Sequence, residues 1–519
     1  MPTVRDATLG LLRELGVTTI FGNPGSTELP LFRDFPEDFR YVLGLQESVA
    51  MGMADGYALA SGNAAMVNLH SSAGTGHALG NLFTAYKNQA PLIVTAGQQA
   101  RSILPFEPFL HAERPTEFPR PFVKWACEPA RAQDVPLAIA RGYYEAMTPP
   151  RGPVFVSVPV DDWDVETDGV AARTVSTLNP GDPVAIARLA AAIEQAQRPA
   201  FVLGAGTARD GAWDQLIALA EQQKAGVYVA PYSSRNVFPE DHPLFLGFLP
   251  AFRARLTAML EEHDLIVAMG GPLNLYHAES SGPHLPDGAA CWSVGDNPST
   301  LAWSPAGNAI LGNTRAIAQA LRTLCAPAYR DAPAPRPASS RPDRAVLDDR
   351  LVMHCIAQAL PDNAIIVEEA PTSRSAMQEH LRLSRPDCFF TTASGGLGYA
   401  VPAAVGIALA RPQARVVAIV GDGSAMYGIQ ALFAACQLDA TITFVIVNNG
   451  RYQALREFGR TFGMQQVVGT DLSGLDFPAL AKGHGLPQGR RVAEAGSLEA
   501  ILAEALASPG PSLVEVLVA

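Results

Sequence analysis

Polar residues follow two apolar runs in the last quarter of the chain. The run VVAIVG ends in Gly-Asp-Gly-Ser, with Asp422 as its acid, and the run TITFVIVN ends in Asn-Asn-Gly, with Asn449 as the second amide. Ligands gather at the carboxyl ends of strands in open α/β sheets, and a helix that starts there offers N–H donors to phosphate. Asp422 alone would repel phosphate. A hard cation between the Asp422 carboxylate and the phosphate would remove this repulsion, because Mg²⁺ takes oxygens from one or two side chains and from substrate phosphates. Asn449 and the backbone carbonyl of Arg451 offer further oxygens.

Each of these two segments, taken alone, also fits a capping aspartate or an Asn-Gly turn. The 24 residues between them, 424–447, predict one helix followed by one strand, which places both segments at the same edge of a parallel sheet. The pair therefore favours a metal-bridged diphosphate site. The apolar positions expected on that helix are Met426, Ile429, Phe433 and Cys436.

Strand-like and helical segments alternate along the whole chain, which predicts parallel sheets with right-handed crossovers. Helices are expected at Glu47–Ala60, Gly76–Lys87 and 184–197. The expected strands are TTIFG, YVLGL, AMVNLH, PLIVTAG, VFVSVP, FVLGAG, VYVAP, LIVAMGG, AIIVEEA, RVVAIVG, TFVIVN and SLVEVLV. We predict three doubly wound α/β domains. Their ranges are 1–180, 181–328 and 345–519, and a Pro-, Ala- and Ser-rich linker occupies 329–344.

The composition excludes several classes of function. A net charge of −12 argues against nucleic-acid binding, which needs clustered Lys and Arg. No apolar run approaches the ~18 residues that a membrane span requires. The N-terminal segment has helical apolar spacing and no signal-peptide core, so a cytoplasmic location is expected. The six cysteines are scattered without a CxxC pair, which argues against a zinc ribbon.

The GDG and NN segments resemble the cofactor motif of the thiamin-diphosphate-dependent 2-oxo acid decarboxylase superfamily. The resemblance implies that Asp422, Asn449 and the Arg451 carbonyl hold Mg²⁺. It also implies a glutamate beside the cofactor pyrimidine, for which Glu47 matches because it opens a helix after a strand. The other implied cofactor contacts are Gly423, Ser424 and Tyr452 at the diphosphate, Thr372 near it after the unusual Pro371, Leu397 as the residue that bends the cofactor, and the Gly395 carbonyl at the pyrimidine amino group.

Nearly the whole chain also resembles the benzoylformate decarboxylase family. The resemblance rests on FGNPGSTELP (21–30), DFPEDFRYVLGLQE (34–47), NLHSSAGTG (68–76), PLIVTAGQQ (91–99) and VPVDDWD (158–164). It implies that Ser26 contacts the substrate carboxylate and that His70 and His277 move protons, with His284 as an alternative to His277.

The same resemblance implies an apolar substrate pocket with departures from the family pattern. The pocket residues it implies are Leu110, Ala454 and Phe458. Thr391 stands where the family has a large aromatic residue, which predicts room for larger aryl substrates unless Phe106 or Phe109 fills the space.

The implied reaction is non-oxidative decarboxylation of an aromatic 2-oxo acid, best matched by benzoylformate, through the ylid and enamine of the cofactor. Carboligation is an expected side reaction. The family further implies the mandelate pathway and a homotetramer whose active sites lie between two subunits.

Each alternative function would require a sequence feature of its own. An acetolactate-synthase-like carboligase would carry a flavin dinucleotide in the middle domain, where LGAGTARDG (203–211) offers glycines. A nicotinamide-dependent dehydrogenase would need GxGxxG after a strand and an acid about 20 residues later, and no stretch of the sequence has both. No His-His pair of the kind found in pyruvate- and indolepyruvate-type decarboxylases occurs.

Overall fold

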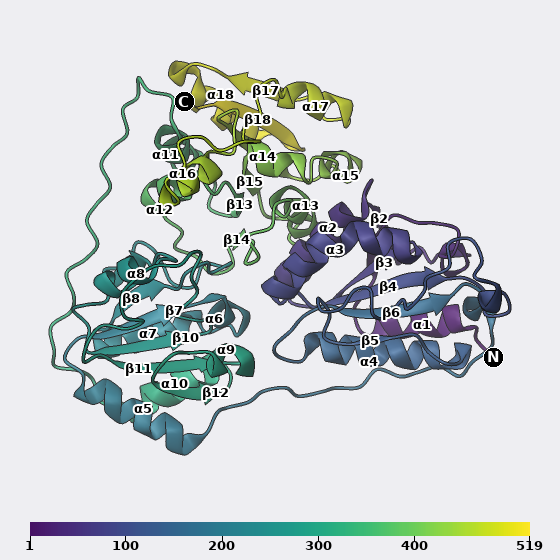
Figure 1. The fold of residues 1–519 in the computed structure, drawn as a ribbon, viewed down its shortest axis with the longest axis horizontal. Helices are drawn as coiled ribbons and strands as arrows, with labels where there is room; N and C mark the ends of the chain where they lie inside the picture. Colours follow the sequence, from purple (N-terminus) through teal and green to yellow (C-terminus); the bar gives the residue numbers. More distant parts are fainter. Residues whose placement is uncertain (519) are drawn as a thin grey trace. The chain divides into compact units, whose positions relative to one another are not determined.

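The computed structural model describes residues 1–518 of the chain. Their contacts divide it into two units. The first unit contains Met1–Val175, Pro342–Ala376 and the chain from Ser394 onward, and the second contains Ser176–Arg341 and Met377–Ala393. Within residues 1–518 there are three sheets of six strands, as the predicted fold class requires (Figure 1).

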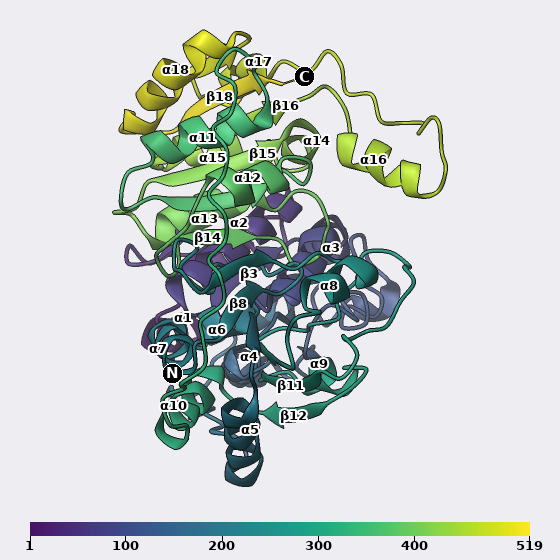
Figure 2. The same cartoon turned by 90° about the vertical axis from the view of Figure 1, so that its left-hand side faces the viewer.

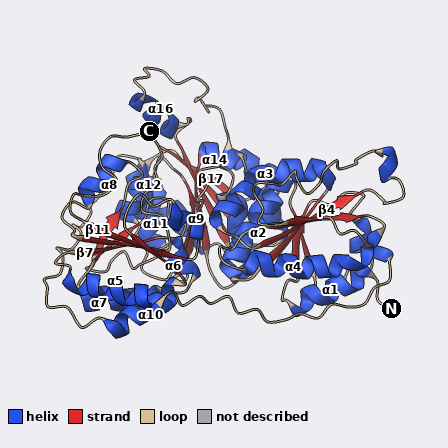
Figure 3. Ribbon diagram, turned by 60° about the horizontal axis from the view of Figure 1, so that its bottom comes forward, coloured by secondary structure: helices blue, strands red, loops and turns tan. Residues whose placement is uncertain are grey.

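The N-terminal sheet has the strand order β2-β1-β3-β4-β6-β5, and all its pairings are parallel. Helices α2 and α3 cover one face and α1 and α4 the other (Figure 3). Because both faces are covered, β3, β4 and β6 are buried along their whole length. The elements are α1 (Val4–Glu14), β1 (Thr19–Gly22), β2 (Arg40–Leu43), α2 (Glu47–Ser61), β3 (Ala65–Leu69), α3 (Ser71–Asn88), β4 (Leu92–Gln98), β5 (Ala126–Cys127), α4 (Val135–Met147) and β6 (Val154–Pro159).

The middle sheet belongs to the second unit and has the order β12-β11-β10-β7-β8-β9. Its pairings are parallel, and α5, α7 and α10 lie together on one face (Figure 3). The elements are α5 (Pro183–Gln195), β7 (Pro199–Leu203), α6 (Ala205–Arg209), α7 (Trp213–Gln223), β8 (Gly226–Val229), β9 (Phe245–Phe248), α8 (Arg253–Met259), β10 (Leu265–Met269), β11 (Ala290–Gly295), α9 (Pro298–Ala302), β12 (Asn308–Leu311) and α10 (Thr314–Leu324).

The C-terminal sheet has the order β14-β13-β15-β16-β18-β17. Helix α16 stands away from this sheet, at the end of the segment that follows β16 (Figure 2). The elements are α11 (Asp349–Ala359), β13 (Ile365–Glu369), α12 (Arg374–His380), β14 (Phe389–Thr391), α13 (Ala400–Ala410), β15 (Val416–Gly421), α14 (Asp422–Met426), α15 (Ala431–Gln437), β16 (Ile442–Asn448), α16 (Gln453–Thr461), α17 (Phe477–Gly483), β17 (Gly489–Val492), α18 (Ala495–Ala507) and β18 (Ser512–Leu517).

The prediction of a single helix between the GDG and NN segments is wrong. Two short helices, α14 and α15, stand there, separated by a turn that contains Gly428. A Cβ at Gly428 would lie 2.8 Å from Cδ of Pro402, so the chain turns against α13 at this point. Of the four apolar positions predicted for one helix face only Ile429 is buried, while Leu432 and Ala435 are fully buried instead.

The predicted linker, 329–344, contains no helix or strand. The domain boundaries drawn from the sequence stay predictions, and the last residue of the predicted C-terminal domain, Ala519, lies outside the described residues. Within residues 1–518, no helix is both long and apolar enough to cross a membrane.

Candidate active site

The predicted metal ligands meet at the carboxyl edge of the C-terminal sheet. Asp422 is the first residue of α14, directly after β15, and it is 4% exposed. Its Oδ2 accepts the backbone N–H of Arg451 at 3.2 Å, and Oδ1 of Asn449 accepts the same N–H at 3.1 Å. A carboxylate oxygen and an amide oxygen therefore converge on one point beyond two neighbouring strands.

This donor set suits a hard cation. Burial raises the pKa of the Asp422 carboxyl above its ordinary value, whereas backbone N–H groups at Gly423, Gly450 and Arg451 lower it. A cation at Asp422 would offset the charge that burial disfavours. Within residues 1–518 no cluster of three or more His, Cys, Asp or Glu side chains could hold a metal ion. One carboxylate with neutral oxygens is a set that Mg²⁺ accepts when phosphates complete its shell.

The glycine after Asp422 is required by its surroundings. A Cβ at Gly423 would lie 2.2 Å from Cε1 of Tyr452, so the Tyr452 ring lies directly over the backbone at the start of α14. The next residue, Ser424, is 4% exposed. The predicted diphosphate contacts Gly423, Ser424 and Tyr452 are thus gathered beside Asp422.

Glu47 lies at the corresponding edge of the N-terminal sheet. Helix α2 begins at Glu47, as the sequence predicts, and the Gln46 side chain caps it by accepting the N–H of Val49 at 3.2 Å. Oε2 of Glu47 lies 3.1 Å from Nδ1 of His77. Gly74 of α3 leaves room on the other side, since a Cβ there would lie 3.3 Å from Oε1 of Glu47. Oε2 of Glu47 therefore faces His77, and Oε1 faces Gly74.

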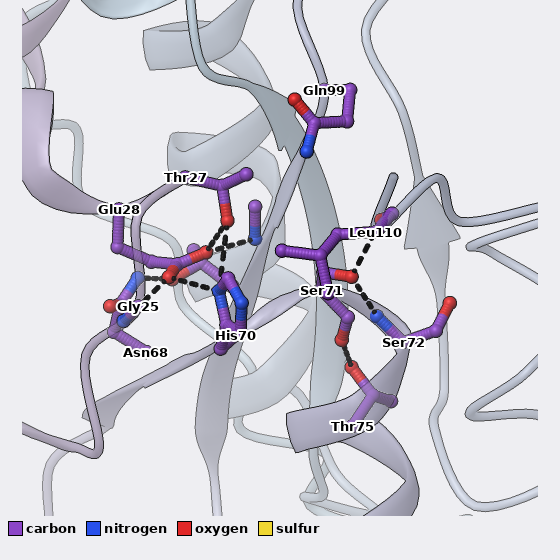
Figure 4. Close-up of polar contacts among 12 residues, drawn as sticks. Gly25, Thr27, Glu28, Asn68, His70, Ser71, Ser72, Thr75, Gln99 and Leu110 are labelled. Atoms are coloured by element: carbon purple, nitrogen blue, oxygen red, sulfur yellow. Dashed lines mark hydrogen bonds and ion pairs between the residues drawn. The ribbon is translucent and has the colours of Figure 1, made fainter. Parts of the chain in front are cut away.

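His70 is held by an acid that sequence reasoning missed. His70 directly precedes α3, and its Nδ1 lies 2.9 Å from Oε2 of Glu28, a residue that is 1% exposed (Figure 4). Glu28 also accepts the N–H of Gly25 at 2.9 Å and that of Gly97 at 3.0 Å. Thr27 donates to its Oε1 at 2.5 Å. Predicted Ser26 lies between Gly25 and Thr27 and is exposed.

The loop that carries Leu110 is fixed to the same edge. Ser71 donates its hydroxyl to the Leu110 carbonyl at 3.0 Å (Figure 4). Gln99 donates to the Phe109 carbonyl at 2.7 Å. Leu110 has φ of 67° and is half-buried. Phe106 and Phe109 are 81% and 87% exposed, so neither packs into the chain's own interior.

The loop with Gly395 and Leu397 is held from two sides. Helix α3 contacts both of its ends, through Thr84 Oγ1 at 2.9 Å from Ser394 Oγ and through Asn81, which donates to the Gly398 carbonyl at 3.1 Å. On the other side lies the carboxylate of Glu369, a second buried acid that no sequence pattern indicated. Its three donors are the N–H groups of Gly398 at 2.6 Å, Tyr399 at 2.9 Å and Ala400 at 2.7 Å.

Two opposed effects act on the pKa of the Glu369 carboxyl. Burial raises the pKa of Glu369 to about 8, and the three N–H groups at the start of α13 oppose that rise. A carboxylate at a helix N-terminus also benefits from the helix dipole. Through its hydrogen bonds to the three N–H groups, Glu369 holds the backbone that directly follows Leu397.

Comparison with known proteins identifies the family of the chain. Residues 2–114, 186–321 and 371–516 match models described as the N-terminal TPP binding domain, the central domain and the C-terminal TPP binding domain of thiamine pyrophosphate enzymes. A benzoylformate decarboxylase from Pseudomonas aeruginosa is 41% identical over 522 residues, covering 99% of each chain. The chain belongs to the benzoylformate decarboxylase family.

Solved structures give the same result. A benzoylformate decarboxylase from Polynucleobacter necessarius superposes with a TM-score of 0.97 at 38% identity, over 100% of this chain and 99% of that one. A thiamine diphosphate-dependent 4-hydroxybenzoylformate decarboxylase from Rhodococcus jostii RHA1 has a TM-score of 0.96 at 40% identity, over 99% of both chains.

Acetolactate synthases are more distant from this family member. A probable acetolactate synthase large subunit from Methanocaldococcus jannaschii is 26% identical over 99% of this chain and 91% of its own. Two of the three glycines at 203–211 are required by the chain's own packing, and the third, Gly211, has a positive φ of 65°. A Cβ at Gly204 would lie 2.6 Å from Cα of Gly271, and one at Gly206 would lie 2.6 Å from the carbonyl oxygen of Gly270.

The remaining residues that the family resemblance implied are spread over both units. In the first unit, Thr372 follows β13 and is half-buried, and Ala454 and Phe458 lie half-buried on α16. In the second, His277 is exposed with its ring 6.1 Å from that of Tyr232, and Thr391 is 1% exposed.

The middle-domain histidines differ in how they are held. His284 is 3.0 Å from the Tyr276 hydroxyl through Nδ1 and 3.3 Å from Nη1 of Arg253 through Nε2. Both ring nitrogens of His284 are therefore engaged. His277 donates its backbone N–H to the Ala251 carbonyl at 2.9 Å.

Proposed function

We propose that the chain decarboxylates an aromatic 2-oxo acid non-oxidatively, converting benzoylformate or a ring-hydroxylated analogue to the aldehyde and CO₂. The full-length match to benzoylformate and 4-hydroxybenzoylformate decarboxylases supports this substrate class. The observation that carries the proposal is that one oxygen of buried Asp422 and one of half-buried Asn449 accept the same backbone N–H, which brings two potential ligands of a diphosphate-bound cation close together.

In this proposal the chain holds thiamin diphosphate through Mg²⁺. Asp422, Asn449 and the Arg451 carbonyl would ligate the ion. Gly423, Ser424, Tyr452 and Thr372 would contact the diphosphate, and Gly395 and Leu397 the rest of the cofactor. When bound, the cofactor supplies the nucleophilic carbon and accepts the electron pair released as CO₂ leaves. Glu47 would exchange a proton with the pyrimidine through Oε1, the oxygen that His77 leaves free.

The remaining residues act on the substrate. Ser26 would donate its hydroxyl to the substrate carboxylate. His70 and His277 would hold and move protons at the substrate oxygen and at the carbon that loses CO₂. Leu110, Ala454, Phe458 and Thr391 would surround the aryl ring. Loss of a charged carboxylate is favoured where water is excluded, because the ionised ground state is poorly solvated there.

We further propose a homotetramer in the cytoplasm, with a role in mandelate breakdown. Each active site would combine Glu47 of one subunit with Asp422 of another. In residues 1–518, none of the hydrogen bonds of Glu47 or His70 described above reaches Asp422 or Asn449. Two separate half-sites in one chain are what such pairing requires.

Calorimetry and a substrate panel test the proposal. Wild type should bind thiamin diphosphate only with Mg²⁺, and Asp422→Ala should lose that binding. Glu47→Gln should keep the binding but exchange the cofactor thiazolium proton orders of magnitude more slowly. Benzoylformate and 4-hydroxybenzoylformate should be decarboxylated well, and phenylpyruvate, pyruvate and branched 2-oxo acids poorly. A flavin absorbance band with acetolactate formation would overturn the proposal.

A further inference from the structure

The two asparagines at the carboxyl end of β16, Asn448 in the strand and Asn449 after it, have different hydrogen-bond partners. Asn449 directs Oδ1 to the N–H of Arg451 at 3.1 Å, beside Asp422. Asn448 is 8% exposed, and its Oδ1 accepts the N–H of Gly450 at 2.9 Å. The Asn448 amide also donates from Nδ2 to Oε1 of Glu515 at 2.7 Å. One side chain therefore links the loop that carries the proposed metal ligands to the neighbouring strand.

Glu515 is a buried anchor for this link. It lies on β18, which pairs with β16, and it is fully buried. Its second oxygen, Oε2, accepts Nε of Arg491 on β17 at 2.6 Å. Arg491 lies 2.9 Å from Asp476 as well. Both oxygens of the Glu515 carboxylate are thus engaged, and its position is fixed by the strands on either side.

Only an amide at position 448 can satisfy both neighbours. Its NH₂ donates to a carboxylate that only accepts, while its carbonyl accepts from a backbone N–H. Aspartate would keep the bond to Gly450 but would put a second carboxylate against Glu515. An unpaired buried acceptor or a like-charge pair is unfavourable, so the loop would have to move.

We propose that Glu515, anchored by Arg491, positions the loop Asn449–Arg451 through Asn448 and so sets the affinity for Mg²⁺ and the diphosphate. Glu515 and Asn448 are positioning residues that act through the loop. This inference rests on the proposed function. Residues that orient metal ligands through hydrogen bonds typically change metal affinity by about 10–100-fold when replaced.

Two variants of adjacent arginines give a matched test. Arg491→Gln removes the charged partner of Glu515, whereas Arg490→Gln removes a partner of Glu504, which Arg490 contacts at 2.8 Å on the exposed side of the same strand. Calorimetry with thiamin diphosphate at several Mg²⁺ concentrations should show about a tenfold or greater rise in Kd for Arg491→Gln. Arg490→Gln should match the wild type. Asn448→Asp should show the larger loss.

Amide hydrogen exchange on the cofactor-free protein gives a second readout. Peptides covering residues 448–453 should exchange faster in Asn448→Asp and Arg491→Gln, while peptides from the N-terminal sheet keep the wild-type rate. If the wild type binds the cofactor but Arg491→Gln and Arg490→Gln have the same Kd and the same exchange rates as each other, the inference is overturned and the proposed function stands. A wild type that binds no thiamin diphosphate with Mg²⁺ would overturn the proposed function as well.

Discussion

Nδ1 of His70 lies 2.9 Å from Oε2 of Glu28, a carboxylate buried among backbone N–H donors. An ionised carboxylate only accepts hydrogen bonds, so this contact places a proton on Nδ1 and leaves Nε2 as the ring nitrogen that can accept one. The acid thereby sets the tautomer of the histidine that the proposed reaction uses. The Thr27 hydroxyl, 3.1 Å from Nδ1, favours the same tautomer, because it donates its proton to Oε1 of Glu28 and so can accept one from Nδ1.

Glu28→Gln should separate this role from cofactor binding. The NH₂ of the new amide must face either Gly25 and His70 or Gly97, and each of these residues already offers an N–H donor. A buried donor that faces another donor lacks an acceptor, which costs about 1–3 kcal/mol of stability. We expect kcat/KM for benzoylformate to fall at least about tenfold, since a positioned proton-transfer group contributes roughly 10²–10⁴-fold. The Kd for thiamin diphosphate should stay unchanged in calorimetry. Glu37→Gln, at an exposed acid of the same segment, is the control.

Gly74 and Gly80 of α3 form a second matched pair. Alanine favours a helix over glycine by about 1 kcal/mol, so both substitutions should stabilise α3. A Cβ at Gly80 meets nothing within 4 Å, whereas one at Gly74 lies 3.3 Å from Oε1 of Glu47. Gly74→Ala should therefore displace the Glu47 carboxylate and lower kcat about tenfold, because small misplacements of reacting groups are costly. Equal kcat values for the two variants would show that Glu47 tolerates the shift.

Much of the fold follows from local sequence, whereas the buried acids do not. Continuous apolar runs such as β4 and β16 predict covered parallel strands, and their polar ends predict the site. Glu28 gives no such signal, since its partners His70 and Gly97 are 42 and 69 residues away. The break between α14 and α15 has the same origin, because it depends on the contact of Gly428 with Pro402.

Asp55 makes the stability of the N-terminal domain depend on pH. Asp55 lies on α2, accepts Nδ2 of Asn88 at 2.9 Å, and burial raises its pKa from 3.8 to about 7. Between these values the folded chain binds the proton that the unfolded chain has released, so this group lowers stability as pH rises. Asp55→Asn removes the titration. Its free energy of unfolding relative to wild type should rise by about 2–3 kcal/mol between pH 5 and pH 8.

Urea unfolding at the two pH values measures the Asp55 effect. The free energy of unfolding of Asp34→Asn, at an exposed aspartate of the same domain, should change with pH as that of the wild type does. If the free energy of unfolding of Asp55→Asn also changes as that of the wild type does, Asp55 does not gain its proton in this pH range.

Leu110 offers the sharpest test of the substrate pocket. Its carbonyl is fixed by Ser71 and its φ is 67°, and alanine keeps a Cβ at this backbone position, so Leu110→Ala changes the side chain without relieving strain. Each lost methylene contact with the aryl ring should cost about 1–3 kcal/mol of discrimination, or roughly 10–200-fold. We therefore expect kcat/KM for benzoylformate to fall at least about tenfold relative to that for pyruvate, which has no ring to contact. Ile103→Ala, in the same loop and 40% exposed, should leave the ratio unchanged. An unaltered ratio in Leu110→Ala would mean that the loop does not line the pocket and that the aryl ring is bound elsewhere.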